Sequence, residues 1–174
     1  MEKKWTHLIV FAVLSGISSV YRLWSTFTAH FDEAAVRKVY EQAGIPNADD
    51  MINMARSSVE LQTSLVMKVF VVLLLLAMVA VVVFLVQKKG ELASYTYIGY
   101  LFGTLVLATY SFVAGRGVLQ QISEESIRQI SQATLMGTFA VQVVLFAVYF
   151  GLTIFFHLRK PKVLPDMGQN ATDI

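Results

Sequence analysis

Four long apolar stretches dominate this chain of 174 residues. A helix needs about 20 mostly apolar residues to cross a hydrocarbon core of about 30 Å, and each stretch meets that length. Because only 15% of the residues are charged and the mean hydropathy is +0.60, we expect a membrane protein rather than a water-soluble domain. The predicted fold is all-α: residues 1–160 form one bundle of four transmembrane helices with short helices in the outer loops, and residues 161–174 form a cytoplasmic tail. The stretches are Leu8 to Phe27, Leu65 to Val86, Tyr95 to Ala114 and Leu135 to Phe156.

Basic residues predict how this bundle is oriented. The two tails and the tight turn after the second stretch hold seven Lys and Arg residues, whereas the two longer loops hold five together with eight acids. Since cytoplasmic loops carry the excess of Lys and Arg, we expect a multi-pass plasma-membrane protein with both termini in the cytoplasm. The seven basic residues are Lys3, Lys4, Lys88, Lys89, Arg159, Lys160 and Lys162.

Both longer loops carry signals of ordered helices. Asp32 is placed to cap a helix that Gly44 can end, and the aspartates at 49–50 are placed to start another helix after the turn at Pro46. Ser123 is expected to begin a third helix, because the two acids that follow it suit the positive end of a helix dipole. The second and third of these helices can continue without a break into the spans behind them.

Small residues indicate how the helices pack. Gly99 and Gly103 stand four apart in the third stretch, and Ala147 and Gly151 stand four apart in the fourth. Such pairs let helix backbones approach closely in lipid, so we interpret both as contacts within the chain, with a dimer contact as the alternative. The second stretch is apolar without interruption from Val69 to Val86, and we expect it to face lipid over much of its surface.

Polar side chains form a stripe along the second half of the first stretch, and weaker stripes follow the third and fourth. A polar stripe on a membrane helix should face protein or water. The bundle is therefore predicted to have a partly polar interior that opens towards the outer side. The stripe residues are Ser15, Ser18, Ser19, Arg22, Ser25 and Thr26, then Tyr100, Thr104 and Ser111, then Gln142, Tyr149 and Thr153.

Arg22 is the most costly of these residues, since it lies about 21 Å from the cytoplasmic end of its span. A guanidinium within the core costs about 3 kcal/mol unless it is paired or hydrated. If Arg56, Lys68 and Arg116 converged on it, the four cations would bind a carboxylate, a phosphate or a lipid head group. The simpler interpretation is that these side chains reach the interface or pair with acids. The candidate lipid- or ligand-binding residues are Arg22, Ser18, Ser19, Arg56, Lys68 and Arg116.

Motifs of catalysis are absent from the sequence. It has no cysteine, no metal-ligand spacing, no nucleophile elbow and no glycine-rich phosphate loop. Glu124, Glu125 and Arg128 resemble the paired glutamates and arginine of intramembrane CAAX-type proteases, but the arginine is one residue too close, and His7 and His157 lie at the far ends of their spans. We predict a protein that is not an enzyme and needs no cofactor or metal, and no basic tract indicates a nucleic-acid partner.

Two functions stay open at this level. The first is a non-catalytic membrane protein whose outer loops and polar first span bind an anionic lipid or another membrane subunit. The second is a small oligomeric channel or transporter subunit for an anionic or neutral solute. No Asp or Glu lies within a span, which argues against a proton-coupled carrier. The expected partners are membrane lipid, another membrane protein or further copies of this chain.

Overall fold

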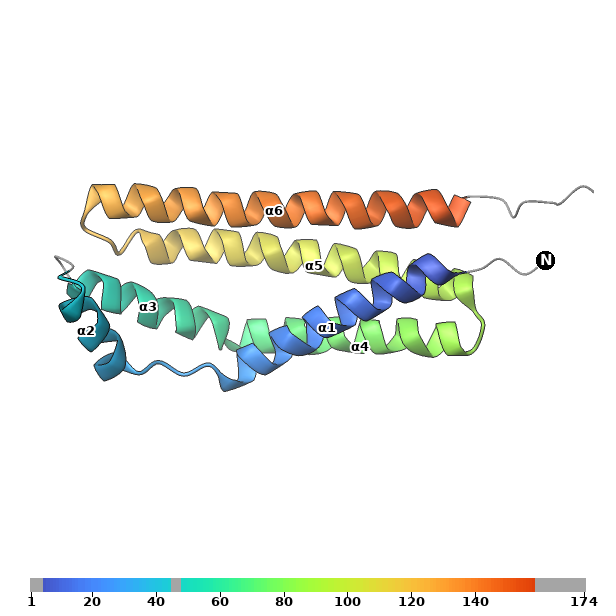
Figure 1. Ribbon diagram of the computed structural model, residues 1–174, viewed down its shortest axis with the longest axis horizontal. Coiled ribbons are helices and arrows are strands. Elements are labelled where there is room, and N and C mark those ends of the chain that lie inside the picture. The colour runs from blue at the N-terminus through green and yellow to red at the C-terminus, as the bar shows by residue number, and fades with distance from the viewer. Residues whose placement is uncertain (1–4, 45–47, 159–174) are drawn as a thin grey trace, which may run out of the picture.

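The computed structural model describes residues 5–44 and 48–158, and within these ranges it contains six helices and no strand. The four long helices run along the length of the molecule, and the two short helices lie at one end of it (Figure 1). The all-α prediction is confirmed. The helices are α1 (Thr6–Thr28), α2 (Glu33–Gln42), α3 (Ala48–Gln62), α4 (Leu65–Val86), α5 (Gly90–Leu119) and α6 (Glu125–Leu158). The predictions for Lys3, Lys4, Pro46, Arg159, Lys160, Lys162 and the tail at 161–174 lie outside the described residues.

The four long helices α1, α4, α5 and α6 are each long and apolar enough to cross a membrane, which fits a helical membrane protein. α4 has the predicted bounds, whereas α5 and α6 are longer than their apolar stretches, with 30 and 34 residues. At 1.5 Å per residue they measure about 45 and 51 Å, more than a core of about 30 Å requires. The surplus of α6 precedes Leu135 and lies at the end where α2 and α3 lie (Figure 1).

The core of the bundle follows one face of α4. Val71, Leu74, Met78 and Val81 recur every three or four residues and are buried against α1 and α5. Most of the remaining side chains of α4 are exposed, so a large part of its surface faces outward as expected. The sequence alone does not distinguish these faces, because every residue of this helix except Lys68 is apolar.

The two small-residue pairs take different positions in the bundle. A Cβ at Gly103 would lie 2.8 Å from Leu74 Cδ2, so this glycine lets α5 approach α4 closely, whereas Gly99 faces open space. Ala147 is exposed and Gly151 has no neighbour within 4 Å of a built Cβ. The interpretation of the α6 pair as a contact within the chain is therefore wrong. Aromatic side chains on another face of α6 make the contact with α5 instead.

The cap of α2 is as predicted. The Asp32 carboxylate accepts a hydrogen bond of 3.0 Å from the Ala35 backbone N–H. After the helix ends, Gly44 has φ +63°, a left-handed conformation that glycine adopts at little cost. Its N–H donates to the Glu41 carbonyl and closes the last turn.

α3 and α4 are separate helices, so the prediction of an unbroken helix is wrong here. The helix ends at Gln62, and Ser64 caps α4 by accepting a hydrogen bond of 3.3 Å from the Met67 N–H. The Ser64 hydroxyl thus takes the place of the backbone carbonyl that would accept from the Met67 N–H in an unbroken helix. This favours the start of a new helix after Ser64. By contrast, α6 begins at Glu125, two residues after the predicted start, and runs unbroken to Leu158.

Candidate functional site

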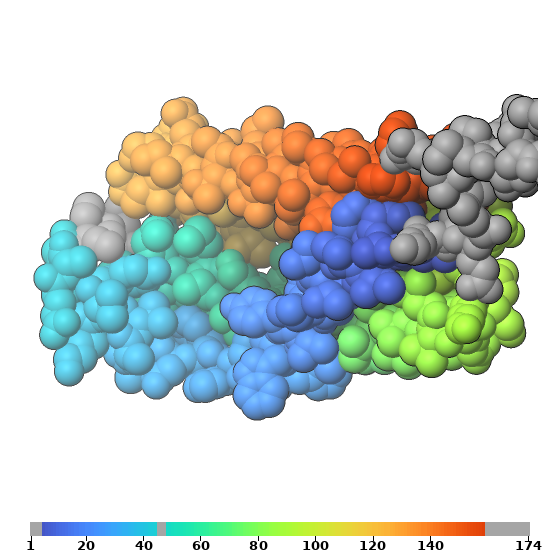
Figure 2. All heavy atoms as spheres, turned by 45° about the vertical axis from the view of Figure 1, so that its right-hand side comes forward, coloured from blue at the N-terminus to red at the C-terminus, as the bar shows by residue number. Residues whose placement is uncertain are grey.

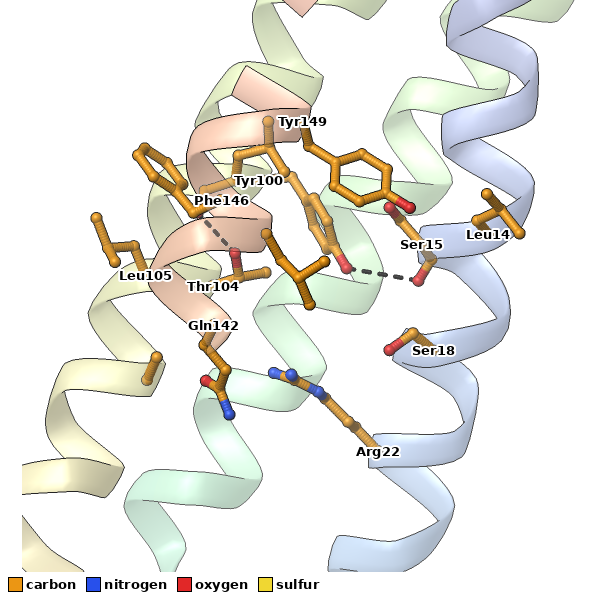
Figure 3. A pocket seen from close by; sticks show the side chains of 13 residues that line it. Leu14, Ser15, Ser18, Arg22, Tyr100, Thr104, Leu105, Gln142, Phe146 and Tyr149 are labelled. Atoms are coloured by element: carbon orange, nitrogen blue, oxygen red, sulfur yellow. Dashed lines mark hydrogen bonds between the residues drawn. The ribbon is translucent and has the colours of Figure 1, made fainter. Parts of the chain in front are cut away.

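A polar cleft lies between α1 and α6, over one face of α5 (Figure 3). It consists of two adjoining cavities of about 200 and 300 Å³, which share Arg22, Ala108 and Gln142 in their walls. Figure 2 shows a hollow on the molecular surface here, with α1 in blue, α3 in teal and α6 in orange around it. The polar residues of the cleft are Ser15, Ser18, Tyr21, Arg22, Ser25, Thr26, Gln62, Tyr100, Thr104, Ser111, Gln142 and Tyr149.

The cleft exists because α1 crosses the bundle obliquely and diverges from α6 (Figure 1). In the first turns of α1, His7 stacks on Phe156 with ring centroids 4.5 Å apart, and Phe11 meets Tyr149 edge to face at 5.2 Å. Further along, α1 packs mainly against α4. The second half of α1 therefore faces α6 across open space, and its polar stripe lines that space.

Two tyrosines of α5 fix the rotation of α1. The Ser15 and Tyr97 hydroxyls are hydrogen-bonded at 2.9 Å, and so are the Ser19 and Tyr100 hydroxyls. Ser19 also donates to the Ser15 carbonyl at 2.8 Å and is buried. Ser19, a predicted binding residue, is thus held at the α1–α5 contact, whereas Ser18 lines the cleft.

Arg22 supplies the positive charge of the cleft. Its half-buried side chain extends from α1 across the opening towards Gln142 of α6 (Figure 3). Within the described part of the chain, it makes no hydrogen bond or ion pair, and the residues that line the cleft include no carboxylate. The guanidinium therefore faces a polar cavity without a counter-charge from these residues.

The other three predicted cations lie elsewhere. Arg56 forms an ion pair with Glu33. The Lys68 ammonium lies 5.6 Å from the centre of the Phe27 ring, and the Arg116 guanidinium lies 6.0 Å from a phenyl ring of its own helix. None of the three lines the cleft. The structure does not bring them together with Arg22, and their role in binding stays a prediction.

The end of α3 borders the mouth of the cleft. The Gln62 amide donates a hydrogen bond of 2.6 Å to the Ser25 hydroxyl, and both residues line the cavity that contains Arg22. At the other end of α3, the Asp50 carboxylate accepts a hydrogen bond of 3.1 Å from the Ser123 N–H. α3 is therefore tied to α1 on one side and to the α5–α6 loop on the other.

Charged residues join α2 to α3. The Arg37 guanidinium lies 3.0 Å from the Asp49 carboxylate and 3.3 Å from that of Glu33. Hydrogen bonds to Asp49 and then to Glu33 raise the pKa of Arg37 above its ordinary value. Both loops predicted to be ordered are thus helical and interconnected.

The residues that resemble a protease motif are far from His7 and His157. Arg128 pairs with Glu125 at the start of α6, whereas His157 lies at its other end with Nδ1 3.0 Å from the Ser94 hydroxyl. Among residues 5–44 and 48–158, no group of three or more His, Asp or Glu side chains is placed to hold a metal ion. Shared proton transfer between these histidines and the glutamates is excluded by distance.

The sequence analysis named the stripe residues of α5 and α6 that line the cleft, Gln142 among them, but not as binding residues. It did not name two other polar residues of the cleft, Tyr21 of α1 and Gln62 of α3. Thr104 lines the cleft, but its hydroxyl bonds the Leu101 carbonyl at 2.7 Å. Tyr97 was missed because a tyrosine near the end of a span is ordinary.

The chain matches the family model described as Domain of unknown function (DUF8777) over residues 1–166 and belongs to this family. Searches of curated proteins and of solved structures gave no match.

Proposed function

We propose that this member of the DUF8777 family is a non-catalytic membrane protein that binds an anionic lipid in the cleft between α1 and α6. The observation that carries the proposal is the half-buried Arg22 guanidinium, which faces a polar cavity with no carboxylate in its walls. An isolated cation inside a membrane is costly, and a bound anion would offset that cost.

The proposed arrangement places four helices across a plasma membrane, with both termini in the cytoplasm and α2 and α3 outside. Lys88 and Lys89 then lie in a cytoplasmic turn, as the positive-inside rule favours. Arg22 is 16 residues after Thr6, about 24 Å along α1, and lies close below the outer boundary of a core of about 30 Å. A head group of the outer leaflet can meet a guanidinium at that depth.

The chemistry of the cleft suits an amphiphile with an oxyanion. Arg22 offers a planar set of donors that matches a phosphate or carboxylate, and the Gln142 amide lies on the opposite side. Below them the walls include Leu14, Leu145 and Phe146, which offer apolar surface to an acyl chain. One molecule could then satisfy both parts of the cleft.

The first prediction concerns Arg22. In nanodiscs that mix phosphatidylglycerol and phosphatidylcholine, Arg22→Gln should lower retention of the anionic lipid roughly tenfold, the loss expected for one charged contact. Arg22→Lys should give an intermediate loss, because it keeps the charge without the bidentate geometry. Retained lipid is measured by native mass spectrometry of the full chain.

Lys38→Gln is the matched control, because it removes one exposed cation on α2 that does not line the cleft. It should retain the anionic lipid like the parent chain. Unchanged retention in Arg22→Gln, or an equal loss in Lys38→Gln, would contradict the proposal.

We propose as the second candidate an oligomeric channel or transporter subunit. The observation that favours it is the exposure of α6, in which Thr153 is the single buried residue. The uncovered small residues Ala147 and Gly151 would let another helix approach. A symmetric homo-oligomer in native mass spectrometry supports this candidate, and a monomer with retained lipid supports the first.

A further inference from the structure

A further cavity, the apolar groove, lies between α3, α5 and α6, has a volume of about 410 Å³ and shares Ser111 with the wall of the polar cleft. α3 and α6 both contact α5, and the groove is the space between them over its last turns. Its walls include Met54 and Leu61 from α3, Leu119 from α5, and Ile130 and Leu135 from α6. The groove is thus larger than either cavity of the polar cleft.

The groove offers little to a charged or polar ligand. None of its lining residues is charged. Ser58, Ser111, Thr134 and Thr138 each donate to a backbone carbonyl of their own helix, at 2.8, 2.9, 3.0 and 2.9 Å. Because these four hydroxyl protons are already bonded, Ser131 supplies the remaining hydroxyl donor of the wall, and an apolar group suits the groove better than water does.

The position of the groove identifies the occupant. Ser111 and Thr138 lie within the third and fourth apolar stretches, whereas Leu119 and Ile130 lie beyond them, beside α3. In the proposed arrangement, the groove therefore begins at the depth of the outer leaflet and continues past it. The flexible apolar group that the adjoining leaflet can supply is a lipid acyl chain.

The size of the groove agrees with a single chain. An apolar cavity of about 150 Å³ holds a benzene ring, so the groove, at about 410 Å³, holds a longer apolar group.

We propose that the apolar groove binds one acyl chain of an outer-leaflet lipid and lifts its end out of the bilayer against α3. The site needs no charge and its wall does not include Arg22, so it also admits zwitterionic lipids. In this proposal, α3 forms one wall of an acyl-chain site, whereas the anion-binding proposal depends on Arg22 of α1.

The test uses the full chain in nanodiscs of phosphatidylcholine that carries a diazirine near the end of one acyl chain. After irradiation, peptide mass spectrometry should find adducts on the α3 segment 54–61, which lies outside the bilayer in the proposed arrangement. Ser131→Phe places a ring in the groove and should lower this adduct roughly tenfold. Ser58→Phe fills the groove from α3 and serves if the first variant does not fold.

Ala133→Phe is the matched control, because Ala133 is exposed on the same helix and does not line the groove. It should leave the adduct on α3 unchanged, and so should Arg22→Gln, which separates this proposal from the anion-binding proposal. The groove proposal is overturned if α3 carries no adduct while α4 and α6 are labelled. It is also overturned if Ala133→Phe lowers the adduct as much as the filling variants do.

Discussion

At the scale of single residues, Arg22 differs from Arg37, Arg56 and Lys68 in what surrounds it. Arg37 and Arg56 pair with acids, and Lys68 lies over an aromatic ring. These local contacts explain why several basic residues at similar heights do not gather at one site. The sequence indicates how far along its span each residue lies. The direction in which its side chain points depends on the neighbouring helices.

Gly90 provides a test of close packing at the first residue of α5. A Cβ built there would overlap the Trp5 indole, so Gly90→Ala should displace the tryptophan and lower the free energy of unfolding by about 1 to 3 kcal/mol. Thermal melting in detergent measures the change. Gly117→Ala is the control, since a Cβ at Gly117 has no neighbour within 4 Å and alanine is the better helix former.

The double variant Trp5→Ala with Gly90→Ala separates overlap from other effects. If the overlap is the cause, Gly90→Ala should lower the free energy of unfolding much less in the Trp5→Ala variant than in the parent chain. An equal loss of free energy in the parent chain and in the Trp5→Ala variant would contradict this explanation.

At the scale of helices, the break between α3 and α4 depends on a side-chain cap. Ser64→Ala removes the acceptor for the Met67 N–H and should destabilise the protein by about 1 kcal/mol. Ser64→Asn should keep most of the stability, because asparagine also caps helices well. The midpoint of thermal unfolding distinguishes the two variants, and equal midpoints would argue against a capping role.

The helices that could be predicted are those with strong local signals. Asp32 and Gly44 mark α2 through chemistry within a few residues, and the apolar run gives α4 its bounds. The break at Ser64 was missed because a serine is compatible with both a helix interior and a cap. The free face of α6 was also missed, since Ala147 and Gly151 do not reveal which neighbour is present.

At the scale of the whole molecule, the polar stripes predicted a partly polar interior, but not its shape. The cleft depends on the oblique course of α1, which is set by contacts with Tyr97 and Tyr100 far along the chain. The crossing of two helices is not encoded in the spacing of either one. The stripes therefore predicted most polar residues of the cleft, such as Tyr100 and Gln142, but neither the shape of the cleft nor the part that Gln62 of α3 has in its wall.

The proposed orientation gives a prediction that involves the entire chain. Since the sequence has no cysteine, single variants can be labelled without background. Ala34→Cys on α2 should react with an impermeant maleimide in intact cells, whereas Glu91→Cys should react only after permeabilisation. Both residues are exposed, so access to the reagent depends on the side of the membrane. The reverse labelling pattern would contradict cytoplasmic termini.

The divergence of α1 from α6 has a mechanical consequence. α1 is held by aromatic stacking at His7, and Arg22 lies about 22 Å further along the same helix. A tilt of about 5° around that pivot shifts the guanidinium by about 2 Å, given the rise of 1.5 Å per residue. The hydrogen bonds of Ser15 and Ser19 to α5 lie between the pivot and Arg22 and oppose such a tilt, so the width of the gap depends on them.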